Sequence, residues 1–127
     1  MSTGTSAEDQ RRRAAHWRSV VATALRSLGI DAEARMPVRH PVDVFDADPD
    51  VYTPGLGVHV VASPVPWSRC SVYLNRAVID ADDRGQGDVP VLIRPAPAEA
   101  PEDAYVITRL HDFARLARDA AKGRDGE

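Results

Sequence analysis

The chain has 127 residues, of which 43% are hydrophobic and 28% are charged, as is typical of one globular domain. The formal net charge of −3 argues against a protein that coats nucleic acid over its whole surface, although it leaves a local basic face open. Residues 1–10 contain no apolar signal segment, and no apolar run approaches the roughly 20 residues of a membrane-spanning helix. The single cysteine, Cys70, excludes an internal disulfide and suits a reducing compartment, so we expect a cytoplasmic protein without a membrane partner.

The first predicted element is a helix over residues 10–28, preceded by a flexible polar tail over residues 1–9. Its apolar residues recur at helical spacing, from Trp17 to Leu28, and Gly29 follows where a left-handed residue often ends a helix. The opposite face carries the basic residues Arg11, Arg12, Arg13, Arg18 and Arg26. Such a face is either simply solvated or a binding surface for phosphates, because neutralised phosphates release counterions.

Three short strands are predicted next, over residues 30–38, 42–45 and 58–62. Between the last two, acidic residues recur at every second position: Asp46, Asp48 and Asp50. Carboxylate oxygens are the hard ligands that Mg²⁺ and Ca²⁺ prefer, although the same pattern is typical of a hydrated acidic turn. It does not fit an EF-hand loop, because Val51 stands where the turn glycine belongs.

The second half of the chain predicts a helix over residues 66–81, strands over 89–94 and 104–108, and a last helix after Thr108. The helix over 66–81 is expected to fray near Asp80, because carboxylates oppose the dipole at a helix C-terminus. The expected fold is one α/β domain over residues 10–121, with a tail over 122–127. Its central mixed β-sheet of four or five strands is flanked by helices in the order α-β-β-β-α-β-β-α. Expected core residues are Trp17, Val21, Leu25, Val58, Val60, Leu74, Val91, Ile93, Val106 and Phe113.

Four stretches carry a family resemblance: residues 17–29, Pro49-Asp50-Val51, residues 57–63, and residues 103–116 with the sequence Asp-Ala-Tyr-Val-Ile-Thr-Arg-Leu-His-Asp-Phe-Ala-Arg-Leu. Together with the order of elements, they resemble the PD-(D/E)xK nucleases, which have a restriction-endonuclease-like fold. More narrowly, the chain resembles the Holliday-junction-resolvase-like proteins of actinobacteria and their phages. The resemblance covers nearly the whole chain and implies DNA as a partner, Mg²⁺ as a cofactor and a homodimer.

The catalytic motif of that family is only partly matched. Asp50 falls at the family's metal-binding aspartate, with Asp48 as a second candidate ligand, but Val61 and Ser63 occupy the glutamate and lysine positions. One carboxylate holds Mg²⁺ weakly, and without the lysine no cation stands beside the attacking water. Glu33 and Arg69 are candidates for catalytic groups that have migrated to other elements.

Three functions remain open. The first is a nuclease-fold protein without catalysis and without a cofactor, which binds nucleic acid weakly through Arg11, Arg12, Arg13 and Arg18 or serves as an interaction module. The second is an active Mg²⁺-dependent endodeoxyribonuclease with migrated catalytic groups. The third is a structural or protein-interaction protein with no nucleic-acid role.

Overall fold

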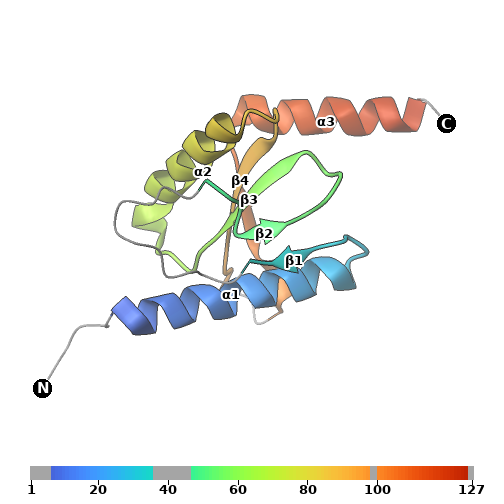
Figure 1. Ribbon diagram of the computed structural model, residues 1–127. Coiled ribbons are helices and arrows are strands. Elements are labelled where there is room, and N and C mark those ends of the chain that lie inside the picture. Colours follow the sequence, from blue (N-terminus) through green and yellow to red (C-terminus); the bar gives the residue numbers. More distant parts are fainter. Residues whose placement is uncertain (1–6, 36–46, 98–99, 126–127) are drawn as a thin grey trace, which may run out of the picture.

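A computed structural model of the chain describes residues 7–35, 47–97 and 100–125, in which three helices surround a five-stranded sheet (Figure 1). In chain order the elements are α1 (Ala7–Ser27), β1 (Glu33–Ala34), β2 (Val51–Tyr52), β3 (Val58–Ala62), the 3₁₀ turn η1 (Trp67–Arg69), α2 (Cys70–Arg84), β4 (Val89–Arg94), the 3₁₀ turn η2 (Pro101–Asp103), β5 (Tyr105–Ile107) and α3 (Leu110–Asp125). The predicted α/β class and the predicted order of elements are confirmed. None of the described helices combines the length and the apolar character needed to cross a bilayer.

The sheet is mixed, with the spatial order β1-β2-β3-β4-β5. β3 and β4 are parallel, with Val60 opposite Val91, and the other neighbouring strands are antiparallel. A parallel pair needs a crossover connection, and η1 with α2 supplies it. The carboxyl end of β3 therefore leads directly into the segment that begins α2.

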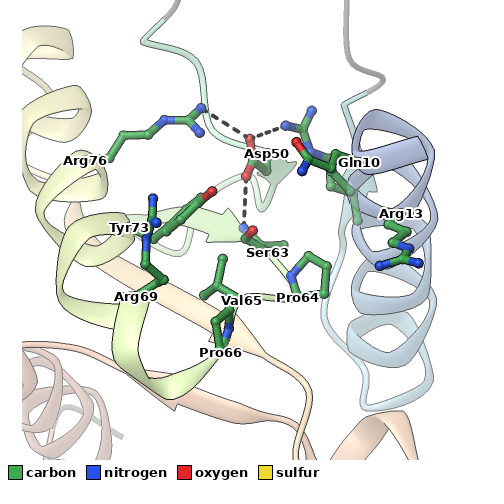
Figure 2. A pocket seen from close by; sticks show the side chains of 13 residues that line it. Gln10, Arg13, Asp50, Ser63, Pro64, Val65, Pro66, Arg69, Tyr73 and Arg76 are labelled. Carbon is green, nitrogen blue, oxygen red and sulfur yellow. Dashed lines mark hydrogen bonds and ion pairs between the residues drawn. The ribbon is translucent and has the colours of Figure 1, made fainter. Parts of the chain in front are cut away.

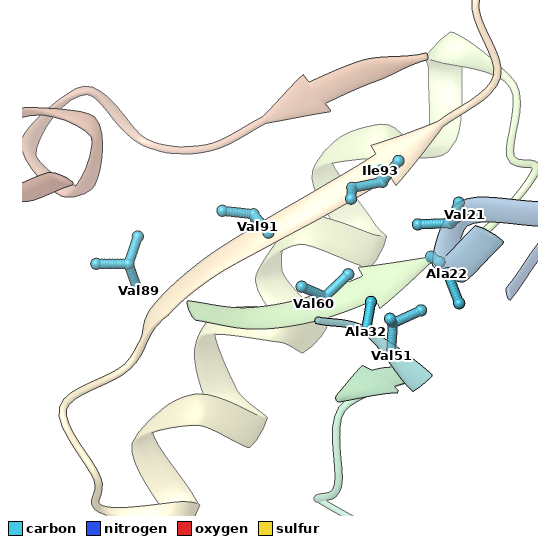
Figure 3. Packing of buried hydrophobic residues seen from close by; sticks show 9 residues of the cluster. Val21, Ala22, Ala32, Val51, Val60, Val89, Val91 and Ile93 are labelled. Atoms are coloured by element: carbon cyan, nitrogen blue, oxygen red, sulfur yellow. The ribbon is translucent and has the colours of Figure 1, made fainter. Parts of the chain in front are cut away.

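Two hydrophobic layers lie on opposite faces of the sheet because side chains alternate along each strand. Val60 and Val91 belong to the cluster that Val21 of α1 completes (Figure 3). Val61 and Leu92 instead pack with Ala77 of α2. The chain is thus three layers deep, with α1 on one face of the sheet and α2 on the other.

α1 is longer than its contact with the core. It spans 21 residues, or about 31 Å at the rise of an α-helix. Its contacts with the α1-side cluster begin at Trp17, whose indole N–H donates to the carbonyl of Ile93 over 3.1 Å. Residues 8–13 are exposed, and Figure 1 shows the N-terminal turns of α1 extending past the strands.

Several predicted boundaries are corrected. The second predicted strand, over residues 42–45, lies outside the described residues and stays a prediction, whereas β2, directly after Asp50, was not predicted. α1 begins at residue 7 and α3 continues to residue 125, inside the segments predicted as tails. α2 does not fray at Asp80 but continues to Arg84, because Arg76 Nε lies 3.4 Å from the buried carboxylate of Asp80.

Two predicted core residues are also wrong: Val106 is 61% exposed and Phe113 is 57% exposed. Val106 lies on the edge strand β5, opposite Ile93, where no helix of the described chain covers it. On α3 only Leu116 reaches the α1-side cluster, so Leu110 and Phe113 form an exposed apolar strip. The other predicted core residues are buried or packed against the two clusters.

Candidate anion-binding site

A pocket of about 490 Å³ opens at the carboxyl end of β3, between the N-terminal parts of α1 and α2 (Figure 2). It is built from three stretches of the chain: two turns of α1, the residue before β2, and the continuous run from the end of β3 into α2. Its lining residues are Gln10, Arg13, Ala14, Arg18, Asp50, Ala62, Ser63, Pro64, Val65, Pro66, Arg69, Tyr73 and Arg76.

Asp50 forms the floor of the pocket and is held from two sides. Its Oδ2 accepts a hydrogen bond of 3.0 Å from the backbone N–H of Ala62, so the carboxylate spans from β2 to the end of β3. Its Oδ1 lies 2.9 Å from Nη2 of Arg18, which reaches in from α1. Both side chains are buried, so this ion pair joins the helix to the sheet inside the protein.

Two further guanidinium groups surround the same carboxylate oxygen. Nη2 of Arg35 lies 3.8 Å from Asp50 Oδ1, and Nη2 of Arg76 lies 3.9 Å from it. Arg35 is fixed by its Nε–H, which donates to the carbonyl of Pro49 over 2.9 Å. One carboxylate is therefore shared by three cations, each from a different element or loop.

Burial raises the pKa of the Asp50 carboxyl above its ordinary value of 3.8. The charges of Arg18, Arg76 and Arg35 and the hydrogen bond from Ala62 oppose that rise. Desolvation disfavours a charged carboxylate, whereas nearby cations and hydrogen-bond donors favour it. The guanidinium groups are thus what makes a charged group tolerable at this depth.

The pocket as a whole is cationic. Four arginines and one aspartate line it, which gives a formal charge of +3 in a chain whose total is −3. Within the described residues, the side chains of Arg13 and Arg69 form no ion pair and no hydrogen bond. Both are exposed, one on α1 and one at the end of η1, on opposite sides of the opening. The pocket can therefore accept an anion without first breaking the Arg18–Asp50 pair.

The basic face predicted on α1 is divided by the fold. Arg13 and Arg18 line the pocket, but Arg18 is buried and is not part of an exposed binding surface. Arg11 and Arg12 lie outside the pocket, and Arg12 is 3.7 Å from Glu8 and 3.6 Å from Asp9 on its own helix.

The predicted acidic and migrated groups do not assemble into one site. Arg69 lines the pocket with Asp50, but Glu33 is exposed on β1 and is not among the lining residues. Asp48 instead pairs with Arg84 at the end of α2. Among the described residues no group of three His, Cys, Asp or Glu side chains is placed to hold a metal ion. A divalent cation does not fit here, since it would compete with three guanidinium groups for one carboxylate.

Val61 and Ser63 were expected, from the resemblance, at the glutamate and lysine positions of a nuclease motif, and they lie at the end of β3 and directly after it. Val61 packs in the α2-side cluster, whereas its neighbours Val60 and Ala62 pack on the α1 side. Ser63 continues that alternation and lines the pocket with Asp50.

Three residues of the site were not found from the sequence: Arg35, Tyr73 and Arg76. The signal for two of them was present, because positions 69, 73 and 76 recur at helical spacing along one edge of the apolar stripe of α2. Arg35 had no such signal, since its role depends on a loop contact with residues 48–50.

His59 is a second buried polar group, beside the site on the same face of β3. It is 1% exposed, and neither ring nitrogen has a hydrogen-bond partner among the described residues. Burial lowers the pKa of this histidine below 6.5, and the charge of Arg84 adds to that shift while Asp50 and Asp88 oppose it. The histidine is thus neutral in the folded protein at neutral pH, and it lies in the core, as its apolar strand predicts.

No family model, curated protein or solved structure matches this chain.

Proposed function

We propose that this chain is a nuclease-like α/β protein that binds nucleic acid by its phosphates in the cationic pocket and does not hydrolyse it. The observation that carries the proposal is the state of Asp50, the one carboxylate among the described residues that line the pocket. Arg18, Arg35 and Arg76 neutralise it, and Arg13 and Arg69 remain to face a ligand. A site built for a metal cation has the opposite charge balance.

The side chains around the opening suit a phosphate group. A guanidinium presents a fork of N–H donors that matches phosphate oxygens in geometry as well as in charge. Arg13 approaches from α1, and Arg69 approaches from the other side of the opening. Ser63 and Tyr73 line the space between them and add hydroxyl donors. Each phosphate neutralised in this way releases counterions, so binding should depend steeply on salt.

The residues that line the pocket do not provide the groups needed to hydrolyse a phosphodiester. The reaction needs a group that activates water and a cation that stabilises the developing charge. The pocket offers cations, but the carboxylate of Asp50 is occupied by arginine, and no second acid lines the space in the part of the chain that the structure describes. Loss of one stabilising donor costs about 10²–10³ in rate, and here the metal ligands and the lysine are absent together.

Binding of labelled single-stranded and duplex DNA at about 50 and 200 mM salt tests the proposal. Arg69→Ala and Arg13→Ala should each weaken binding and reduce the slope of log affinity against log salt by about one. Arg11→Ala is the matched control, because Arg11 is exposed on the same helix but outside the pocket. Absence of binding at low salt, or equal loss in Arg11→Ala, would contradict the proposal.

Incubation of branched and linear DNA with Mg²⁺ or Mn²⁺ tests the alternative of an active endonuclease. We expect intact DNA. Metal-dependent cleavage by the purified protein, lost in Asp50→Ala, would establish that alternative and show that the missing groups are supplied elsewhere.

The second candidate is a protein-interaction module, and the exposed apolar residues Val106, Leu110 and Phe113 favour it. The homodimer that the resemblance implies is one form of such an interaction. Sedimentation of the wild-type protein and of Phe113→Ser checks it: a dimer that the substitution dissociates would assign these residues to an interface.

A further inference from the structure

An exposed tryptophan stands next to the cationic pocket. Pro66 and Arg69 line the pocket, and Trp67 lies between them in the chain. The Trp67 ring packs toward Tyr105 of β5, so it lies beside the pocket rather than within it. Trp67 is nevertheless 57% exposed, which leaves a large aromatic surface in water.

Two neighbouring residues contact the indole ring. The Arg94 guanidinium lies 4.0 Å from the centre of the Trp67 ring, and the ring of Tyr105 lies 5.4 Å away at an interplanar angle of 33°. Arg94 and Tyr105 are cross-strand partners in β4 and β5, so both rise from the same face of the sheet. Although both residues contact the ring, Trp67 is 57% exposed, so part of its aromatic surface remains accessible to a ligand.

Arg94, which contacts the Trp67 ring, is itself hydrogen-bonded to a residue that lines the pocket. Arg94 Nε–H donates to the carbonyl of Val65 over 3.0 Å, and Val65 lines the pocket. The ring orientation is therefore fixed relative to the cationic opening, and little side-chain freedom is left to lose when a ligand covers the ring.

A fixed aromatic surface beside a cationic groove is the combination that holds unpaired nucleotides, with phosphates in the groove and bases on the ring. Bases in a duplex are already stacked and paired, so they reach such a ring only after unpairing. We propose that Trp67 is a base-stacking platform and that the ligand of this chain is single-stranded nucleic acid. The inference rests on the proposed function, because the adjoining phosphate site supplies the charge.

Two probes of equal length and charge test the platform: an oligothymidylate and its abasic counterpart, which keeps the phosphates but lacks the bases. The wild-type protein should bind the oligothymidylate about tenfold more tightly than the abasic strand, as expected for one stacked base. Trp67→Ala should remove that difference and leave the affinity for the abasic strand unchanged, whereas Trp67→Tyr should retain it. Phe113→Ala is the control, because Phe113 is an exposed aromatic residue on α3.

The outcomes separate the two proposals. Equal wild-type affinity for both probes, with steep salt dependence, would overturn the platform and leave phosphate binding intact. Equal weakening of both probes by Trp67→Ala would assign Trp67 a packing role and also overturn the platform. If neither probe binds at low salt, the proposed function is overturned as well. The comparison of the two probes in wild-type protein needs no variant to fold.

Discussion

Arg18 on α1 and Asp50 before β2 form an ion pair with Nη2 and Oδ1 2.9 Å apart, and their side chains are only 10% and 2% exposed. Removal of two charges from water is costly, so such a pair is weak evidence of added stability. Its effect is instead on what the site can bind. The carboxylate is committed to arginine, and the pocket above it keeps a surplus of positive charge.

Asp50→Asn should lower the free energy of unfolding by about 3–5 kcal/mol, because it leaves the charge of Arg18 buried without its closest counter-ion. The amide oxygen of asparagine can still accept the hydrogen bond from the Ala62 N–H, so the variant removes only the negative charge at this position. Urea denaturation measures the change. Asp82→Asn, at an exposed position on α2, is the control. A loss below about 1 kcal/mol would show that the pair behaves as a solvated one.

The same Asp50→Asn variant should bind nucleic acid more tightly than the wild-type protein, since it removes the one negative charge that lines the pocket. Affinity measured at low salt decides this, where the electrostatic difference is largest. Weaker binding by a folded variant would mean that Asp50 assists the ligand rather than opposing it.

The double substitution Val61→Glu with Ser63→Lys should not create a magnesium site. Val61 is 1% exposed in the α2-side cluster, so a glutamate there would be buried and would destabilise the fold by several kcal/mol. The lysine would face a pocket that already carries four arginines. Thermal unfolding with and without Mg²⁺ should show a lower Tm and no metal-dependent gain. A clear rise in Tm with Mg²⁺ would refute the assignment of the pocket as anion-specific.

Stability should fall as pH drops below about 6.5, in part because of His59. Its pKa is lowered in the folded state, so in this range the unfolded chain binds a proton that the folded chain does not. The raised pKa of Asp50 acts with the opposite sign nearer its ordinary value of 3.8. His59→Phe should flatten the dependence below pH 6.5, as measured by urea denaturation across pH, whereas His16→Phe, at an exposed position, should leave it unchanged.

Phe113→Ser should change the free energy of unfolding by no more than about 0.5 kcal/mol, because the ring is 57% exposed. Leu92→Ala should cost about 2–5 kcal/mol, since this side chain is fully buried in the central strand β4. Chemical denaturation of both variants makes the comparison. Similar losses in the two would mean that α3 packs more closely than its exposure indicates.

Strands with their own hydrophobic runs were predictable from the sequence. The bounds predicted for β3 and β4, 58–62 and 89–94, are those of the structure. β2 is two residues long and follows an acidic turn, so it has no periodicity to read. It is defined by pairing with β1 and β3, and such tertiary contacts leave no local signal.

The site shows the same limit more sharply. Asp50 was singled out by the family resemblance, but the pattern of α1 predicted Arg18 on an exposed basic face, either solvated or phosphate-binding. Helical periodicity assigns a charged residue to water unless a partner is known, and here the partner lies 32 positions away in the chain. Exposure of Phe113 was missed for the converse reason, because an apolar stripe on α3 does not reveal whether anything covers it.

The N-terminal turns of α1, which extend past the strands, should unfold locally more readily than the rest of the helix. Residues 8–13 make no contact with the hydrophobic clusters, so that end of the helix is held chiefly by hydrogen bonds within its own turns. Short helical segments without packed apolar contacts open at low free-energy cost, and their amides exchange quickly. Gln10 and Arg13 lie in those turns and line the pocket together with residues of α2. A bound ligand that contacts both helices would therefore stabilise this end of α1. Hydrogen exchange at these few amides would then report occupancy of the pocket, because slow exchange there requires a ligand that bridges the two helices.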